Sequence, residues 1–82
     1  MKYSDNQIVQ LGDEVELWNG CHGVVVCSMD DNEYSERYPK TEWQYLKSGV
    51  LIETDKAGLI HYTEPDEDLR LRKRAEGKIQ IT

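Results

Sequence analysis

Apolar and polar positions alternate over the first part of the chain in a pattern that is typical of β-strands. Residues 14–18 place valine and leucine on one face and glutamate on the other. An Asn-Gly pair, a strong hairpin signal, follows at 19–20, and consecutive valines open the segment 24–29. The pattern predicts a hairpin in which 24–29 is the most buried strand and Cys21 or Gly23 adds a bulge.

The second half of the chain carries the same kind of pattern. Residues 50–54 and 59–63 are short apolar runs around a tight turn, and they predict a second hairpin. Residues 69–72 alternate leucine with arginine, which predicts a last or edge strand with both arginines facing water. Residues 73–82 either continue this strand or end as a tail, and the tail interpretation applies to 77–82.

The segment 30–49 interrupts the strand pattern with mixed charged and aromatic residues. Residues 41–47 predict about two helical turns, with Thr41 or Ser35 as the cap and Gly49 as the stop. Loops of this length are uncommon in compact domains and are often functional. The segment is therefore the main departure from a plain β-meander.

The spacing of the strands predicts a mainly β single domain over residues 1–82, folded as a small bent antiparallel barrel with one short helix in its long central loop. Residues 11–17, followed by turn glycines and a valine-rich strand, resemble the start of KOW-type SH3-like barrels. The resemblance spans residues 10–29 and implies an SH3-like fold. KOW hairpins in ribosomal and transcription proteins are typically basic, whereas this one carries Asp13, Glu14 and Glu16.

Charge changes the functional picture more than the fold. The chain has 16 acidic and 10 basic residues, a net charge of -6, and residues 13–36 contain acids but no lysine or arginine. An acidic surface repels phosphate backbones and attracts basic proteins, so nucleic acid is a disfavoured partner. The N-terminus lacks the apolar core of a signal peptide, and no apolar run approaches a membrane span. These features predict a cytoplasmic protein without membrane contact.

The two cysteines and two histidines do not form a metal or disulfide pattern. Cys21 and Cys27 fall in one predicted strand, which separates them by about 20 Å, whereas a disulfide needs Cα atoms within about 7 Å. His22 and His61 lack a second ligand at the short spacing that structural zinc sites use. We expect reduced thiols and no metal or cofactor.

No residue set in the sequence points to catalysis. Ser28, Cys27 and His61 have side chains suited to nucleophilic chemistry, but their spacing is that of ordinary strand residues. The acidic run 30–33 lacks the glycine and the distant glutamate of a calcium loop. The sequence therefore predicts a protein that is not an enzyme.

The central segment is the candidate partner-binding surface, because aromatic residues there are interleaved with acids. Tyrosine and tryptophan dominate binding hot spots since they offer wide, rigid contact at a small entropic cost. The alternative is that Trp43 and Leu46 cap an open end of the barrel, with the tyrosines half buried around them. The predicted partner-binding residues are Asp30, Asp31, Glu33, Tyr34, Glu36, Tyr38 and Trp43.

Three functional hypotheses follow from these residues. In size, charge and composition the chain resembles small acidic bacterial immunity proteins, which implies an inhibitor that binds a toxin with a basic surface. A first alternative is a KOW-like module that binds RNA, the ribosome or transcription machinery through the basic strand 70–78. A second is a phage-type inhibitor that imitates the charge pattern of DNA.

Overall fold

The hairpin predicted near the N-terminus is present in the computed structural model, which describes residues 1–74. Strands β1 (Glu14–Trp18) and β2 (Cys21–Ser28) pair antiparallel. Of the two turn residues, only Gly20 has a positive φ, at 89°. The turn is therefore not of type I′, which requires a positive φ at both central positions.

The second predicted hairpin is also present. Strands β4 (Val50–Thr54) and β5 (Leu59–Tyr62) pair in regular register without a bulge. In the turn between them, the Thr54 hydroxyl donates to the Gly58 carbonyl over 2.7 Å and accepts from the Ala57 amide over 2.8 Å. Gly58 has φ 70°, a conformation that glycine adopts without steric penalty.

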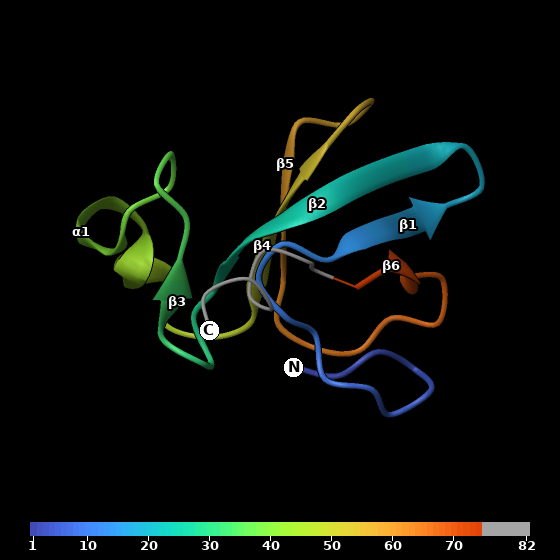
Figure 1. The fold of residues 1–82 in the computed structure, drawn as a ribbon, viewed down its shortest axis with the longest axis horizontal. Coiled ribbons are helices and arrows are strands. Elements are labelled where there is room, and N and C mark those ends of the chain that lie inside the picture. Colours follow the sequence, from blue (N-terminus) through green and yellow to red (C-terminus); the bar gives the residue numbers. More distant parts are fainter. Residues whose placement is uncertain (75–82) are drawn as a thin grey trace.

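The strands build one six-stranded antiparallel sheet in the order β5-β4-β2-β1-β6, and the short β3 (Glu33–Tyr34) pairs with β2 beside this path (Figure 1). Strand β6 (Arg70–Lys73) is the edge strand that the sequence predicts, with both arginines exposed. The mainly β, bent antiparallel fold with one short helix is thus confirmed. The expected tail at 77–82 lies outside the described residues.

The helix lies in the central segment as predicted, but its ends differ from the prediction. Helix α1 (Lys40–Trp43) continues directly into the 3-10 turn η1 (Gln44–Leu46). A proline precedes the helix without any side-chain cap, so neither Thr41 nor Ser35 caps it. The helix stops at Lys47, which has φ 71°, two residues before the glycine expected to stop it. Within residues 1–74 no helix has the length and apolar character needed to cross a bilayer.

The two faces of the sheet carry separate apolar clusters. The inner cluster includes Tyr3 and Val9 of the N-terminal segment, and the outer cluster lies under residues 30–49. The inner cluster consists of Tyr3, Val9, Val15, Leu17, Cys21, Val25, Val50, Ile52 and Leu69. The outer cluster consists of Val26, Cys27, Met29 and Leu51.

A bulge in β2 explains why both faces are apolar. Val25 pairs with Ile52, but Cys27 pairs with Leu51, so Val26 is an extra residue in the ladder between β2 and β4. An extra residue reverses the alternation of the side chains that follow it. Val26 and Cys27 consequently both belong to the outer cluster. The outer face of the sheet therefore has an apolar surface of its own.

The bulges do not fall where the sequence predicts them. The irregularity in the β1–β2 ladder lies between Glu16 and Trp18, on β1, and not at Cys21 or Gly23. Residues 25–29 are buried, in line with the prediction for the most buried strand, but Val24 is 40% exposed. It lies on the outer face of the sheet, next to Val26 of the outer cluster.

A buried carboxylate ties the chain's outlying segments to the sheet. Asp13 is fully buried and accepts hydrogen bonds from the Tyr3 hydroxyl at 2.7 Å and from the Gln10 amide at 2.9 Å. Arg74, which follows β6, donates to the same oxygen at 3.1 Å and to the Ile8 carbonyl at 2.8 Å. A buried carboxylate is tolerated only when it is paired and hydrogen-bonded, so these donors have to converge.

We expect Asp13→Ala to lower the free energy of unfolding by about 3 kcal/mol, because it leaves buried donors without an acceptor. Urea denaturation followed by circular dichroism measures this change. Glu64→Gln, on the exposed connection between β5 and β6, is the control and should stay within about 0.5 kcal/mol of the unmodified chain. Equal losses in the two variants would contradict the proposed role of Asp13.

The same network predicts a pH dependence on the alkaline side. Burial raises the pKa of the Tyr3 hydroxyl above its ordinary value, and the hydrogen bond to Asp13 raises it further. Above about pH 10 the unfolded chain loses the Tyr3 proton while the folded chain retains it, so stability falls as pH rises. Tyr3→Phe should make this fall shallower by up to about 1.4 kcal/mol per pH unit. An unchanged slope between about pH 9 and 11 in urea titrations would overturn this expectation.

Candidate functional site

Residues 30–49 form a lobe beside the sheet, the central lobe, which carries β3, α1 and η1 (Figure 1). Its base is closed by Asp30, whose carboxylate accepts from the Gly49 amide at 3.0 Å and from the N-terminal amine at 2.8 Å. Gly49 has φ 82°, and a Cβ there would collide with the Tyr62 carbonyl. The base of the central lobe therefore depends on a glycine at this position.

The aromatic residues of the central lobe are seated on the outer cluster. Tyr34, Tyr38, Trp43 and Leu46 are half buried against it. The rings of Tyr38 and Trp43 lie 5.6 Å apart between centroids. Trp43 and Leu46 are therefore packing residues, but what they cover is the outer cluster; that they cap an open end of a barrel stays a prediction.

Tyr45 is the most exposed aromatic ring of the central lobe. Its side chain is 66% exposed, and its ring stacks on Trp43 with centroids 6.2 Å apart and an interplanar angle of 28°. The sequence-based partner-binding set omits this residue. The helical spacing of Trp43 and Leu46 is the sequence signal that could have identified Tyr45 as exposed. Residues at i and i+3 share one face of a helix, and Tyr45 lies outside that face.

Two of the four predicted acidic residues also make hydrogen bonds that hold the central lobe, although both are exposed. Asp30 closes the base of the central lobe, and Asp31 accepts a hydrogen bond from the Ser28 hydroxyl at 3.2 Å. Both lie in the turn between β2 and β3. Glu33 is half buried on β3, whereas Glu36 is exposed in the loop before α1. The seven predicted residues thus lie in one lobe, where Asp30, Asp31 and Glu36 are exposed and the other four are half buried.

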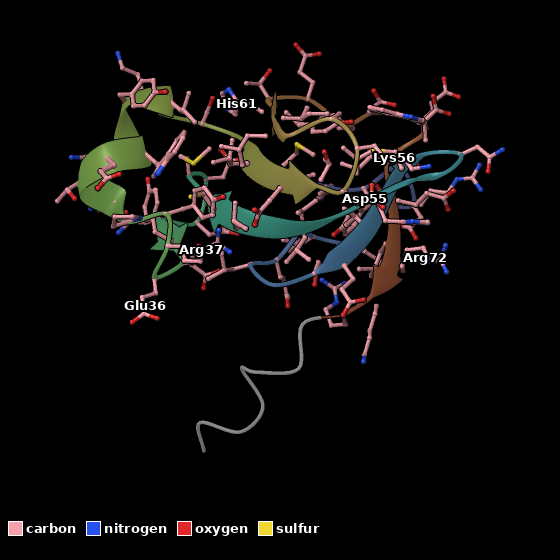
Figure 2. The ribbon with its side chains drawn as sticks, turned by 90° about the horizontal axis from the view of Figure 1, so that it is seen from above. Glu36, Arg37, Asp55, Lys56, His61 and Arg72 are labelled. Atoms are coloured by element: carbon pink, nitrogen blue, oxygen red, sulfur yellow. The ribbon has the colours of Figure 1, made fainter. Side chains whose placement is uncertain are left out.

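The central lobe covers only part of the outer face of the sheet and leaves a groove beside it. One hollow of about 390 Å³ lies between the lobe and the sheet, where Ser35, Arg37 and Tyr38 face Val24 and Glu53. A second hollow of about 480 Å³ adjoins it through Val24 and Glu53 and extends toward the far end of β2. Figure 2 shows Arg37 at the lobe end of β2 and Asp55 and Arg72 toward the opposite end. We call the two hollows together the junction groove.

Two carboxylates flank the exposed valine on the floor of the junction groove. Glu14 and Val24 are opposite each other on β1 and β2, and Val24 and Glu53 are opposite each other on β2 and β4. Directly opposed residues in neighbouring strands lie about 5 Å apart, so the two carboxylates stand on either side of Val24. The floor is apolar in the middle and acidic on both sides.

Glu53 also interacts with the wall that the central lobe provides. Arg37 pairs with it at 3.8 Å, and the Arg37 guanidinium lies 5.8 Å from the centre of the Tyr38 ring. Burial raises the pKa of the Tyr38 hydroxyl, and the negative charge of Glu53 and its hydrogen bond raise it further. Tyr38 therefore keeps its proton at neutral pH and stays a neutral partner for a cation.

The far end of the junction groove holds a row of polar and charged side chains from β1, β2, β6 and the turn after β4. The Nδ1 atom of His22 lies 3.8 Å from Asp55, and its Nε2 atom lies 3.3 Å from the Arg72 guanidinium. Arg72 in turn pairs with Glu16 at 3.5 Å. These side chains are between 25% and 55% exposed, so their contacts contribute little to stability.

The cysteines and His61, which were candidates for metal binding or catalysis, are buried in the core or hydrogen-bonded to the backbone. Cys21 and Cys27 are both buried thiols without a disulfide, and burial raises the pKa of Cys27. His61 bonds through Nε2 to the Ser48 carbonyl at 2.7 Å. Among residues 1–74, no three histidine, cysteine or carboxylate side chains are grouped to hold a metal ion.

Comparisons with protein-family models, with curated proteins and with solved structures found no match to this chain.

We expect Trp43 and Tyr45 to respond differently to truncation, since one ring is seated on the outer cluster and the other is displayed. Trp43→Ala should lower the free energy of unfolding by about 2 kcal/mol, because it empties a packed position. Tyr45→Ala should change it by less than about 0.5 kcal/mol. Thermal denaturation of both variants measures the difference. A larger loss in Tyr45→Ala would mean that this ring is a structural residue.

Proposed function

We propose that this chain is a non-catalytic protein-binding domain whose central lobe contacts a basic surface on a partner protein. The observation that carries the proposal is the stacked pair of Trp43 and Tyr45. Trp43 is seated on the outer cluster, so Tyr45 is presented to solvent by a rigid support. A large aromatic ring that is exposed yet pre-positioned loses little entropy on binding, which is the property of interface hot spots.

The acidic excess of the chain supports a basic partner. Glu36 and Glu42 are exposed in the same lobe, and the whole chain carries a net charge of -6. Exposed charges of this kind accelerate association with an oppositely charged surface, whereas buried aromatic anchors slow dissociation. The most specific form of the proposal is a cytoplasmic immunity-type inhibitor that covers the basic surface of a toxin.

The alternatives have less support. Binding of RNA along 70–78 would use basic side chains of β6 and the residues after it, but Arg72 pairs with Glu16 and Arg74 donates to the buried Asp13. A DNA-like charge pattern would need a continuous row of carboxylates. Asp13 is fully buried and Asp30 is bound to the N-terminal amine, which removes both from such a row.

The proposal predicts a partner whose binding depends on the central lobe. Immunity proteins are encoded beside their toxins, so the product of the neighbouring gene is the partner to test, by calorimetry and by rescue of growth on co-expression. Tyr45→Ala should weaken binding about 30-fold through faster dissociation. Glu36→Gln with Glu42→Gln should slow association and reduce its salt dependence.

Matched substitutions away from the central lobe provide the control for this test. Glu64→Gln with Glu67→Gln removes the same charge from the exposed connection between β5 and β6 and should leave association nearly unchanged. If the neighbouring product does not bind, or if the control pair weakens binding as much as the lobe variants do, the proposal is wrong. Salt-dependent binding of RNA that is lost in Arg70→Gln would favour the KOW-like alternative instead.

A further inference from the structure

The junction groove combines three features that a positively charged side chain requires. Its floor presents Val24, 40% exposed, between the carboxylates of Glu14 and Glu53. Its wall presents the ring of Tyr38, and its volume on the lobe side, about 390 Å³, is large enough for a side chain. An aliphatic stem can lie on the valine while its charged end meets a carboxylate and an aromatic face.

The chain itself already places a guanidinium at this position. Arg37 lies 3.8 Å from Glu53 and 5.8 Å from the centre of the Tyr38 ring. Its own side chain is 77% exposed, so the contact is a surface ion pair that contributes little to folding. Arg37 can therefore move aside without disturbing the sheet or the outer cluster.

We propose that the lobe end of the junction groove is a binding site for an arginine side chain of the partner, which takes the place of Arg37 on Glu53 and Tyr38. The inference rests on the proposed function, and it names the chemical group that the basic partner inserts. The aliphatic stem of that arginine lies on Val24, and a small apolar residue beside it in the partner extends this apolar contact, so an arginine next to a small apolar residue is the preferred sequence.

Arginine suits the site better than lysine for two physical reasons. The planar guanidinium stacks on an aromatic face, and it donates two parallel hydrogen bonds to one carboxylate. The ammonium of lysine is a compact, strongly hydrated charge and makes neither arrangement as well. The site should therefore discriminate between two side chains of equal charge.

The experiment titrates the ¹⁵N-labelled protein with the blocked peptide Val-Arg-Val and follows backbone amide shifts by NMR. Saturable shifts should centre on Val24, Tyr38 and Glu53. The lysine peptide should bind about threefold more weakly, and the citrulline peptide, which has the same shape without charge, should not saturate. Glu53→Gln should weaken the arginine peptide about fivefold.

Arg37→Gln gives the sharpest test, because it removes the resident guanidinium. This variant should bind the arginine peptide about three- to fivefold more tightly than the unmodified chain. Lys40→Gln removes one positive charge from the same lobe at an exposed position, and it should change the affinity by less than about twofold. Thermal denaturation of each variant checks that the fold is retained.

Several outcomes would overturn the inference. These are shifts spread over all acidic segments, equal effects of Arg37→Gln and Lys40→Gln, and binding that does not depend on Glu53. Its failure is distinguishable from failure of the proposed function. If a partner is lost with Tyr45→Ala but not with Glu53→Gln, the central lobe binds the partner and the arginine site is wrong. If the peptide binds as expected while Tyr45→Ala has no effect on the partner, the arginine site holds and the proposed use of the lobe surface fails.

Discussion

The fold depends on one buried carboxylate. Asp13 lies just before β1, and it accepts hydrogen bonds from the N-terminal segment, from the turn that precedes it, and from Arg74 beyond β6. Because an unpaired charge in this environment is strongly unfavourable, these segments have to meet at one point. Their convergence draws Tyr3 and Val9 onto the inner cluster and holds Arg74 close to the segment that precedes β1. A chain of 82 residues has a small apolar core. The hydrogen bonds to Asp13 fix the positions of segments that this core alone does not hold in place.

Much of this fold follows from local sequence patterns. The strict alternation in β1, the turns around Gly20 and Gly58, and the arginines of β6 each predict their elements correctly, because each pattern acts within a few residues. The bulge at Val26 is different, since it depends on how β2 meets β4, a strand more than twenty residues later. An uninterrupted valine run is compatible with burial on either face of a sheet. The sequence alone therefore does not locate the bulge, where the alternation of side chains between the two faces is reversed.

The candidate site was predicted at the level of the segment and less well at the level of the residue. An acidic and aromatic insertion in a β-meander correctly indicates an added lobe. Its aromatic residues were interpreted as a binding surface, with packing as the alternative, and Tyr34, Tyr38 and Trp43 are half buried against the outer cluster. Which carboxylates help to hold the lobe depends on tertiary hydrogen bonds, such as the contact between Asp30 and Gly49, that no local pattern encodes. The junction groove was not predicted at all, because Glu14, Val24 and Glu53 come from three strands and become neighbours only through strand order.

The attachment of the central lobe has a consequence for how such a protein diversifies. Ser28 and Val50 are directly opposed across β2 and β4, so the lobe enters and leaves the sheet at one place, as a hairpin loop would. A loop of another length can be exchanged there without changing the strand order, since loop length itself has a small effect on stability. The outer cluster limits which loops are tolerated. Val26, Cys27 and Leu51 would be exposed to water unless the new loop covers them with its own side chains. Relatives that bind other ligands are therefore expected to keep the outer cluster, while the sequence of the loop that covers it varies.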